Sequence, residues 1–190
     1  MNAIKSRVNK EKDFLQVISL IQTARQKAFY SINLQLIELY WTIGKYITTK
    51  LKNAQWGESV VNELAIFISK KHPDLKGYSD KNLWRMKKFY ETYFKKPKLS
   101  PLVRQLSWTH NTIILSKTKS YEEKEFYLQL SIKENYSKRE LERQIDSGFF
   151  ERSLISTKRF PLQTKQKKQE FVNSFKDTYV LDFLDLPKNY

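Results

Sequence analysis

The sequence predicts an all-α fold, a multi-helix bundle containing a helix-turn-helix-like unit. Only four of the 190 residues are Gly and five are Pro, and no Pro precedes Pro73, whereas an all-β chain needs turn residues about every 8 to 12 positions. Apolar residues recur at steps of three and four, which is the spacing of one helix face. Because 40% of the residues are hydrophobic, the chain can bury a core.

The first helical segment is long. Its apolar positions run from Phe14 to Leu51 on one stripe. Roughly 38 residues at about 1.5 Å of rise each would reach nearly 60 Å, which is longer than a compact domain of this size is wide. One long helix or two helices joined by a kink both fit the pattern, and we expect two packed segments with a bend near residues 31–33.

The second helix is expected to begin near Gly57 or Glu58 and to end before Pro73 and Gly77, since Pro and Gly terminate helices. Ser79 is a suitable N-cap for a third helix that reaches residue 94. The two helices, separated by a short turn, form the helix-turn-helix-like unit.

The later helices are read mainly from their caps. After a loop over residues 95–101, a helix is expected over 108–117 with Thr109 as its cap. Capping boxes, in which a Ser and a Glu three residues later satisfy each other's backbone N–H groups, predict two further helix starts. These boxes are Ser120 with Glu123 and Ser137 with Glu140. Gly148 is expected to end the last of these helices.

Three regions follow from this organisation. Residues 1–152 form the helical domain, and residues 153–170 read as a basic linker rich in Lys, Arg, Gln, Ser and Thr. Residues 171–190 regain an apolar pattern but are too few to bury it alone. We expect this segment either to dock on the helical domain or to begin a second domain.

The chain is strongly basic. Lys and Arg outnumber Asp and Glu by 35 to 20, a net charge of +15, which favours polyanionic partners, chiefly nucleic acid and secondarily anionic membranes. No secretory signal and no apolar run long enough to span a bilayer occurs. We therefore expect a soluble cytoplasmic protein whose partner is DNA and not a membrane.

The third helix carries the best candidate site. At about 100° per residue, Leu83 and Met86 fall on one side and Lys81, Arg85 and Lys88 on the other, so a cationic face could enter a major groove. The candidate DNA-binding residues are Lys76, Ser79, Lys81, Asn82, Arg85, Lys87 and Lys88. In this set, Asn82 and Arg85 suit base edges, and Lys81, Lys87 and Lys88 suit phosphates. A solvated surface on an ordinary bundle is the alternative interpretation.

Catalytic residues are not evident. There is no Cys and only two His, so neither a thiol nucleophile nor a zinc site of these residues is predicted. Glu122 and Lys124 have a Glu-x-Lys spacing, but acids in a first helical turn are explained by the helix dipole. His72 and His110 are expected to be structural. We predict no catalytic residue, metal or cofactor for this chain.

Two ordered sets of residues carry a family resemblance. The first set is Trp56, Gly57, Val60, Val61, Leu64, Pro73, Leu75, Lys76, Gly77, Tyr78, Ser79, Asn82, Leu83, Arg85, Met86, Phe89 and Tyr90. The second is Leu106, Trp108, His110, Asn111, Leu115, Glu122, Glu123, Phe126, Tyr127, Tyr136, Ser137, Glu140, Leu141, Arg143, Gln144, Ile145, Phe150, Glu151 and Arg152. Together they resemble the N-terminal domain of the YhcG family.

The resemblance implies a helical, DNA-binding domain that precedes a nuclease domain of the PD-(D/E)XK superfamily. Residues 175–184 are similar to the start of that nuclease domain, and the implied catalytic core does not follow before Tyr190. The resemblance thus implies a DNA-targeting domain without its own catalytic core. The alternative is a protein-interaction or oligomerisation module that docks a restriction or defence partner, or a second copy in a homodimer.

Overall fold

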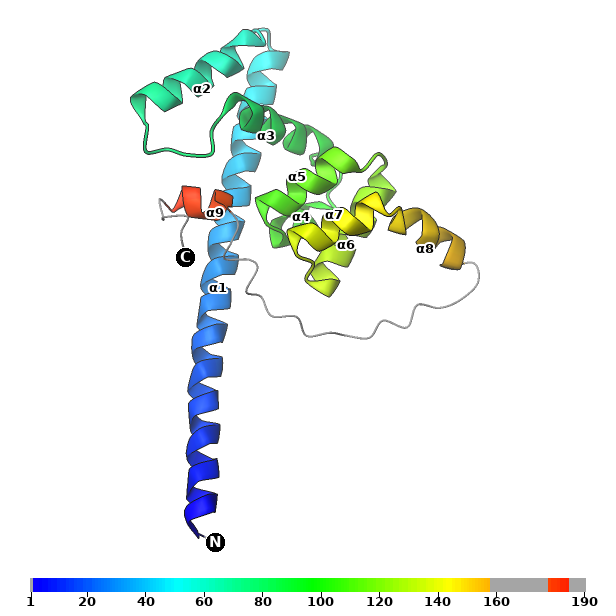
Figure 1. Ribbon diagram of the computed structural model, residues 1–190. Helices are drawn as coiled ribbons and strands as arrows, with labels where there is room; N and C mark the ends of the chain where they lie inside the picture. The colour runs from blue at the N-terminus through cyan, green and yellow to red at the C-terminus, as the bar shows by residue number, and fades with distance from the viewer. Residues whose placement is uncertain (1, 158–177, 185–190) are drawn as a thin grey trace.

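The computed structural model describes residues 2–157 and 178–184, which form helices and no strand (Figure 1). This confirms the predicted all-α fold for the described residues. The helices are α1 (Asn2–Lys52), α2 (Ser59–Lys71), α3 (Asp80–Tyr93), α4 (Ser100–Gln105), α5 (Trp108–Lys117), α6 (Tyr121–Glu134), α7 (Lys138–Asp146), α8 (Phe149–Thr157) and α9 (Thr178–Phe183). In the described part of the chain, no helix is both long and apolar enough to cross a bilayer.

Helix α1 is one unbroken helix, so the expected bend near residues 31–33 is wrong. Asn33 lies at that point and is buried, and its side-chain amide donates hydrogen bonds to the carbonyl oxygens of Arg104 and Leu106 at 3.3 and 3.1 Å. This contact anchors α1 without interrupting its backbone. N-terminal to it, α1 projects from the rest of the described structure (Figure 1). The expectation failed because it assumed that the chain buries the whole apolar stripe itself.

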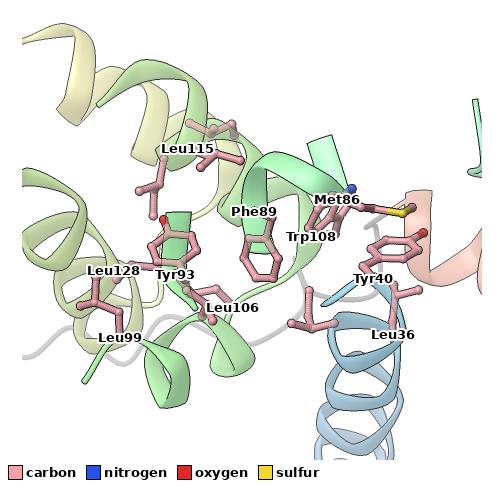
Figure 2. Packing of buried hydrophobic residues seen from close by; sticks show 14 of the residues in the cluster. Leu36, Tyr40, Met86, Phe89, Tyr93, Leu99, Leu106, Trp108, Leu115 and Leu128 are labelled. Atoms are coloured by element: carbon pink, nitrogen blue, oxygen red, sulfur yellow. The ribbon is translucent and has the colours of Figure 1, made fainter. Parts of the chain in front are cut away.

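The C-terminal half of α1 packs against α3 and completes the core. A Cβ added to Gly44 would lie 2.1 Å from the carbonyl oxygen of Met86, so the two helix backbones are in close contact there. Figure 2 shows Tyr40, Phe89 and Trp108 meeting in this core, with ring centroids 4.8 Å apart for Tyr40 and Trp108 and 5.2 Å for Phe89 and Trp108. These edge-on aromatic contacts join α1, α3 and α5.

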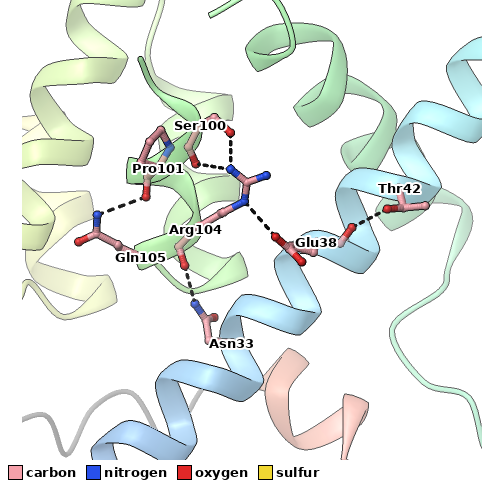
Figure 3. A network of polar contacts seen from close by, with 7 residues as sticks. All are labelled: Asn33, Glu38, Thr42, Ser100, Pro101, Arg104 and Gln105. Carbon is pink, nitrogen blue, oxygen red and sulfur yellow. Dashed lines mark hydrogen bonds and ion pairs between the residues drawn. The ribbon is translucent and has the colours of Figure 1, made fainter. Parts of the chain in front are cut away.

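Helix α4 begins inside the region expected to be a loop, residues 95–101. Its Arg104 side chain donates a 2.6 Å hydrogen bond to the hydroxyl of Ser100 and lies 3.3 Å from the carboxylate of Glu38 in α1 (Figure 3). This short helix depends on tertiary contacts, which the local sequence pattern does not reveal.

Most of the predicted caps are confirmed. Ser79, Ser120 and Ser137 each accept a hydrogen bond from a backbone N–H in the first turn of α3, α6 and α7 respectively. The prediction that Thr109 caps α5 is wrong, because Ser107 is the N-cap and accepts a hydrogen bond from the backbone N–H of His110. The sequence offered two suitable hydroxyl residues two positions apart, and the local pattern did not separate them.

His110 has the expected structural role. One ring nitrogen, Nδ1, lies 2.8 Å from the Ser107 hydroxyl, and the other, Nε2, lies 2.8 Å from the carbonyl oxygen of Tyr136. The imidazole therefore joins the start of α5 to the turn that precedes α7.

The C-terminal part differs from the predicted division. Helix α8 continues through residue 157, so the first residues of the expected linker over 153–170 are helical, and residues 158–170 lie outside the described residues. Helix α9 packs on α1, with Val180 only 4% exposed and the Tyr179 ring edge-on to Tyr40. The described residues 178–184 thus dock on the helical domain, and the other residues of the 171–190 segment lie outside the description.

Candidate nucleic-acid interface

Helix α3 occupies the centre of the helical domain. Its inner face carries Leu83, Met86, Phe89 and Tyr93, which are at most 1% exposed, and it packs on α1, α2 and α5. The Ser79 hydroxyl caps its start. Because its inner face is buried, α3 cannot rotate about its own axis, and the side chains on its outer face therefore keep a fixed direction.

Three cations share the outer face of α3. Lys81, Arg85 and Lys88 are exposed and follow at steps of four and three, so they lie along one side over about 10 Å of helix. Among the described residues, none of the three forms an ion pair. We call these three residues the α3 stripe, and they create a positive potential that nearby described acids do not neutralise by direct contact.

Lys87 differs from the α3 stripe. Its ammonium lies 2.8 Å from the carboxylate of Glu91 in an i,i+4 ion pair and 5.5 Å from the centre of the Trp84 ring. The side chain is half-buried. Lys87 therefore already has an acidic partner, and a phosphate would have to compete with that carboxylate.

Asn82 has a structural role. The side chain is 2% exposed, its amide donates a hydrogen bond to the carbonyl of Gly77, and its oxygen accepts one from Trp108 Nε1 at 2.9 Å. The amide edge that would have to meet adenine is directed into the protein. The geometry thus argues against the expected base contact, and Asn82 instead fixes the turn before α3 to α5.

Lys76 and Ser79 precede the helix. The Lys76 ammonium donates a hydrogen bond to the carbonyl of Pro73, and the Ser79 hydroxyl is engaged as the N-cap. Both residues are exposed. They border the α3 stripe at the start of the helix but are not part of it.

Arg85 also lines a groove of about 630 Å³ bounded by α3, α5 and α7, with α9 at one edge. Lys117 and Lys138 line the same groove, and sequence reasoning missed both of them. Lys117 lies 2.7 Å from a carboxylate oxygen of Asp146. Glu142 also lies in the groove wall, so the groove is of mixed charge. The spacing of residues within one helix cannot predict a groove that three helices form together.

The Glu-x-Lys triplet of α6 holds the loop that precedes this helix through hydrogen bonds. Lys124 is 7% exposed and donates a 2.8 Å hydrogen bond to the carbonyl of Thr118, while the Glu123 carboxylate accepts a 2.7 Å hydrogen bond from the backbone N–H of Lys119. Burial lowers the pKa of the Lys124 ammonium, although the nearby Glu123 carboxylate acts to raise it. Within the described part of the chain, no group of three His, Asp or Glu side chains is arranged to hold a metal ion.

Comparisons with known proteins agree with the resemblance seen in the sequence. The chain is 26% identical over 212 aligned positions to the Escherichia coli (strain K12) protein named "Putative nuclease YhcG". The match covers 92% of this chain and 56% of that relative, so the chain spans little more than half of its length. No solved structure gives a significant match. The model of the DUF1016 N-terminal domain matches residues 16–152, and the chain therefore belongs to the DUF1016 N-terminal domain family.

Proposed function

We propose that this chain binds duplex DNA, largely through phosphates, and acts as the DNA-targeting domain of a PD-(D/E)XK-type nuclease. The observation that carries the proposal is the α3 stripe, three exposed cations on a helix whose opposite face is fixed in the core. The relative named as a nuclease and the net charge of +15 support the same function. Sequence-independent binding of this kind depends on phosphate neutralisation.

The dimensions of the α3 stripe suit a phosphate backbone. The stripe covers about 10 Å, and successive phosphates on one strand advance about 3.4 Å along the duplex axis. Lys81, Arg85 and Lys88 could therefore contact phosphates within about three nucleotide steps. Arg85 is the residue best suited to a base edge as well, because its guanidinium can donate two parallel hydrogen bonds to guanine.

The test is the salt dependence of DNA binding. If about five phosphates are neutralised, log K should fall against log salt with a slope of about −4.5, and nonspecific dissociation constants should lie at about 10⁻⁴ to 10⁻⁶ M. Replacing Lys81, Arg85 and Lys88 together by Gln should bring the slope to about −1.8, since each lost contact removes about 0.9. Fluorescence anisotropy of a labelled duplex at several salt concentrations measures both slopes.

A matched control removes the same charge elsewhere. Lys12 and Lys45 on α1 and Arg139 on α7 are exposed and lie outside the α3 stripe, and their joint replacement by Gln should leave the slope close to −4.5. Equal slopes for the two triple variants would show that net charge, and not the α3 stripe, determines binding. Absence of binding at low ionic strength would reject the proposal.

We expect the chain alone to bind DNA without cutting it. Incubating a supercoiled plasmid with the protein and Mg²⁺ tests this expectation, because a single nick converts the plasmid to a slower form on a gel. Metal-dependent nicking that is abolished by Glu122→Gln and Lys124→Gln would contradict it.

A further inference from the structure

The groove bounded by α3, α5 and α7 is held open by contacts at both ends. Near its start, the ring nitrogen Nε2 of His110 lies 2.8 Å from the carbonyl oxygen of Tyr136 and joins α5 to the turn before α7. Near its end, the ammonium of Lys117 lies 2.7 Å from the carboxylate of Asp146 and joins the last turns of the same two helices. The volume of about 630 Å³ suits a small ligand and is too small for a duplex.

Two cations of this groove are free of acidic partners. Arg85 of α3 and Lys138 at the start of α7 both line the groove and are exposed. Neither of them forms an ion pair with a described residue, whereas Lys117 is already paired with Asp146. A phosphate in the groove would therefore receive charge-assisted hydrogen bonds from two different helices.

The rest of the groove wall offers hydrogen-bond acceptors. On α5, the Thr112 hydroxyl donates to the carbonyl of Thr109 at 2.9 Å. The Ser116 hydroxyl donates to the carbonyl of Ile113 at 3.1 Å. The hydrogen of each hydroxyl is thus engaged within α5, while its oxygen can still accept a hydrogen bond. Glu142 of α7 adds a half-buried carboxylate, which also only accepts. These groups favour the N–H donors of a ligand and disfavour a second phosphate.

An aromatic ring lies at the edge of the groove. Tyr179 of α9 lines the groove and is half-buried. Its ring is edge-on to those of Tyr40 and Trp108, with centroids 6.5 Å away in both cases, so the core holds it in place. Unpaired bases stack on aromatic side chains of this kind.

We propose that the groove binds one unpaired nucleotide of a DNA strand, with its phosphate at Arg85 and Lys138 and its base beside Tyr179. A nucleotide carries a phosphate and, in adenine, cytosine and guanine, an exocyclic amine, which together match the cations and the acceptors. This assignment rests on the proposed function, because Arg85 belongs to both the groove and the α3 stripe. A strand that leaves a duplex bound along the α3 stripe enters the groove at Arg85. The preferred substrate is therefore a duplex with an unpaired strand.

The first test compares three forms of one labelled duplex by fluorescence anisotropy. The duplex is blunt, or carries a short overhang of cytidines at its 3′ or its 5′ end, or carries the same overhang without bases. We expect one cytidine overhang to bind about tenfold more tightly than the blunt duplex, since stacking of one base supplies a gain of this order. The overhang without bases should bind like the blunt duplex. Equal affinity with and without bases would show that only the added phosphates act, and would overturn the assignment.

The second test uses two neighbouring cations of α7. Lys138→Gln should reduce the ratio of overhang to blunt affinity from about tenfold to about twofold, because the phosphate loses one of its two cations. Arg139→Gln removes the same charge at an exposed position that does not line the groove, and the ratio should stay at about tenfold. Equal ratios for the two variants would overturn the assignment.

The third test concerns the amine of the base. Deoxyuridine has an acceptor oxygen where cytidine has its amine, so an overhang of deoxyuridines should bind about fivefold more weakly than one of cytidines. Equal affinities would overturn the role of the acceptors. A chain that binds the blunt duplex with the expected salt slope but does not prefer an overhang would refute the groove site and leave the proposed function intact. A chain that binds neither form would refute both.

Discussion

Replacing Gly44 by Ala should push apart α1 and α3, the two helices that pack together at the centre of the domain. The added Cβ would lie 2.1 Å from the carbonyl oxygen and 2.7 Å from the carbonyl carbon of Met86, and 3.1 Å from Cβ of Tyr90. Ordinary carbon contacts begin near 3.4 Å, so α1 and α3 would have to move apart by about 1.3 Å at this point. The obstacle is backbone, which cannot turn away as a flexible side chain can.

The expected cost follows from two opposing effects. Overpacking a well-packed core costs about 1 to 3 kcal/mol, and a backbone clash of this size belongs at the upper end. Ala is better than Gly within a helix by about 1 kcal/mol, which offsets part of that cost. We therefore expect Gly44→Ala to lower the free energy of unfolding by about 2 kcal/mol and to lower Tm by about 4 to 8 °C for a chain of this size.

Gly57 provides the matched control. A Cβ there would meet only the Ser59 hydroxyl, at 3.9 Å, so Gly57→Ala should leave Tm nearly unchanged. Urea denaturation and thermal unfolding followed by circular dichroism measure both variants. If Gly44→Ala were as stable as the wild type, the close approach of α1 and α3 at this position would be refuted.

Three further substitutions test individual contacts. Asn82→Ala leaves the Gly77 carbonyl and the indole N–H of Trp108 unpaired, so the free energy of unfolding measured by urea denaturation should fall by about 2 to 3 kcal/mol. The DNA affinity of the folded protein should stay unchanged. A loss of affinity without a loss of stability would show that Asn82 contacts a base after all. Tyr93→Phe removes a buried hydroxyl that has no partner among the described residues, so stability should stay equal or rise. Burial, with Tyr121 nearby, raises the pKa of Tyr93. The contribution of Tyr93 to the free energy of unfolding is therefore present below its unfolded-state pKa of about 10 and is lost as pH rises through its folded-state pKa. Above about pH 10, stability should fall less in Tyr93→Phe than in the wild type, and identical pH profiles would contradict this. Ser137→Ala removes the N-cap of α7 and should cost about 1 kcal/mol, measured as a lower urea midpoint; an unchanged midpoint would show that this cap contributes nothing.

Local signals predicted most helix boundaries because each acts within one turn. Ser79, Ser120 and Ser137 cap their helices as expected, since capping depends on residues three positions apart. The straight course of α1 and the existence of α4 could not be predicted in this way. Both depend on contacts between distant segments, such as that of Asn33 with the carbonyl of Arg104, 71 residues away.

The same distinction between local signals and contacts between distant segments applies to the candidate site. Helical periodicity was sufficient to place Lys81, Arg85 and Lys88 on one exposed face, because the opposite face is strongly apolar. It could not reveal that Asn82 is held by Trp108, 26 residues away. Periodicity also could not predict that Lys138 of α7 lines the same groove as Arg85, because that placement depends on how three helices assemble.

The continuity of α1 fixes the distance between its projecting end and the core. Ile21 lies about 35 Å along the helix from Gly44, where α1 meets α3. Because the helix is unbroken, whatever contacts the projecting half of α1 is held at a constant distance from α3. A bend at residue 31 would make that distance variable.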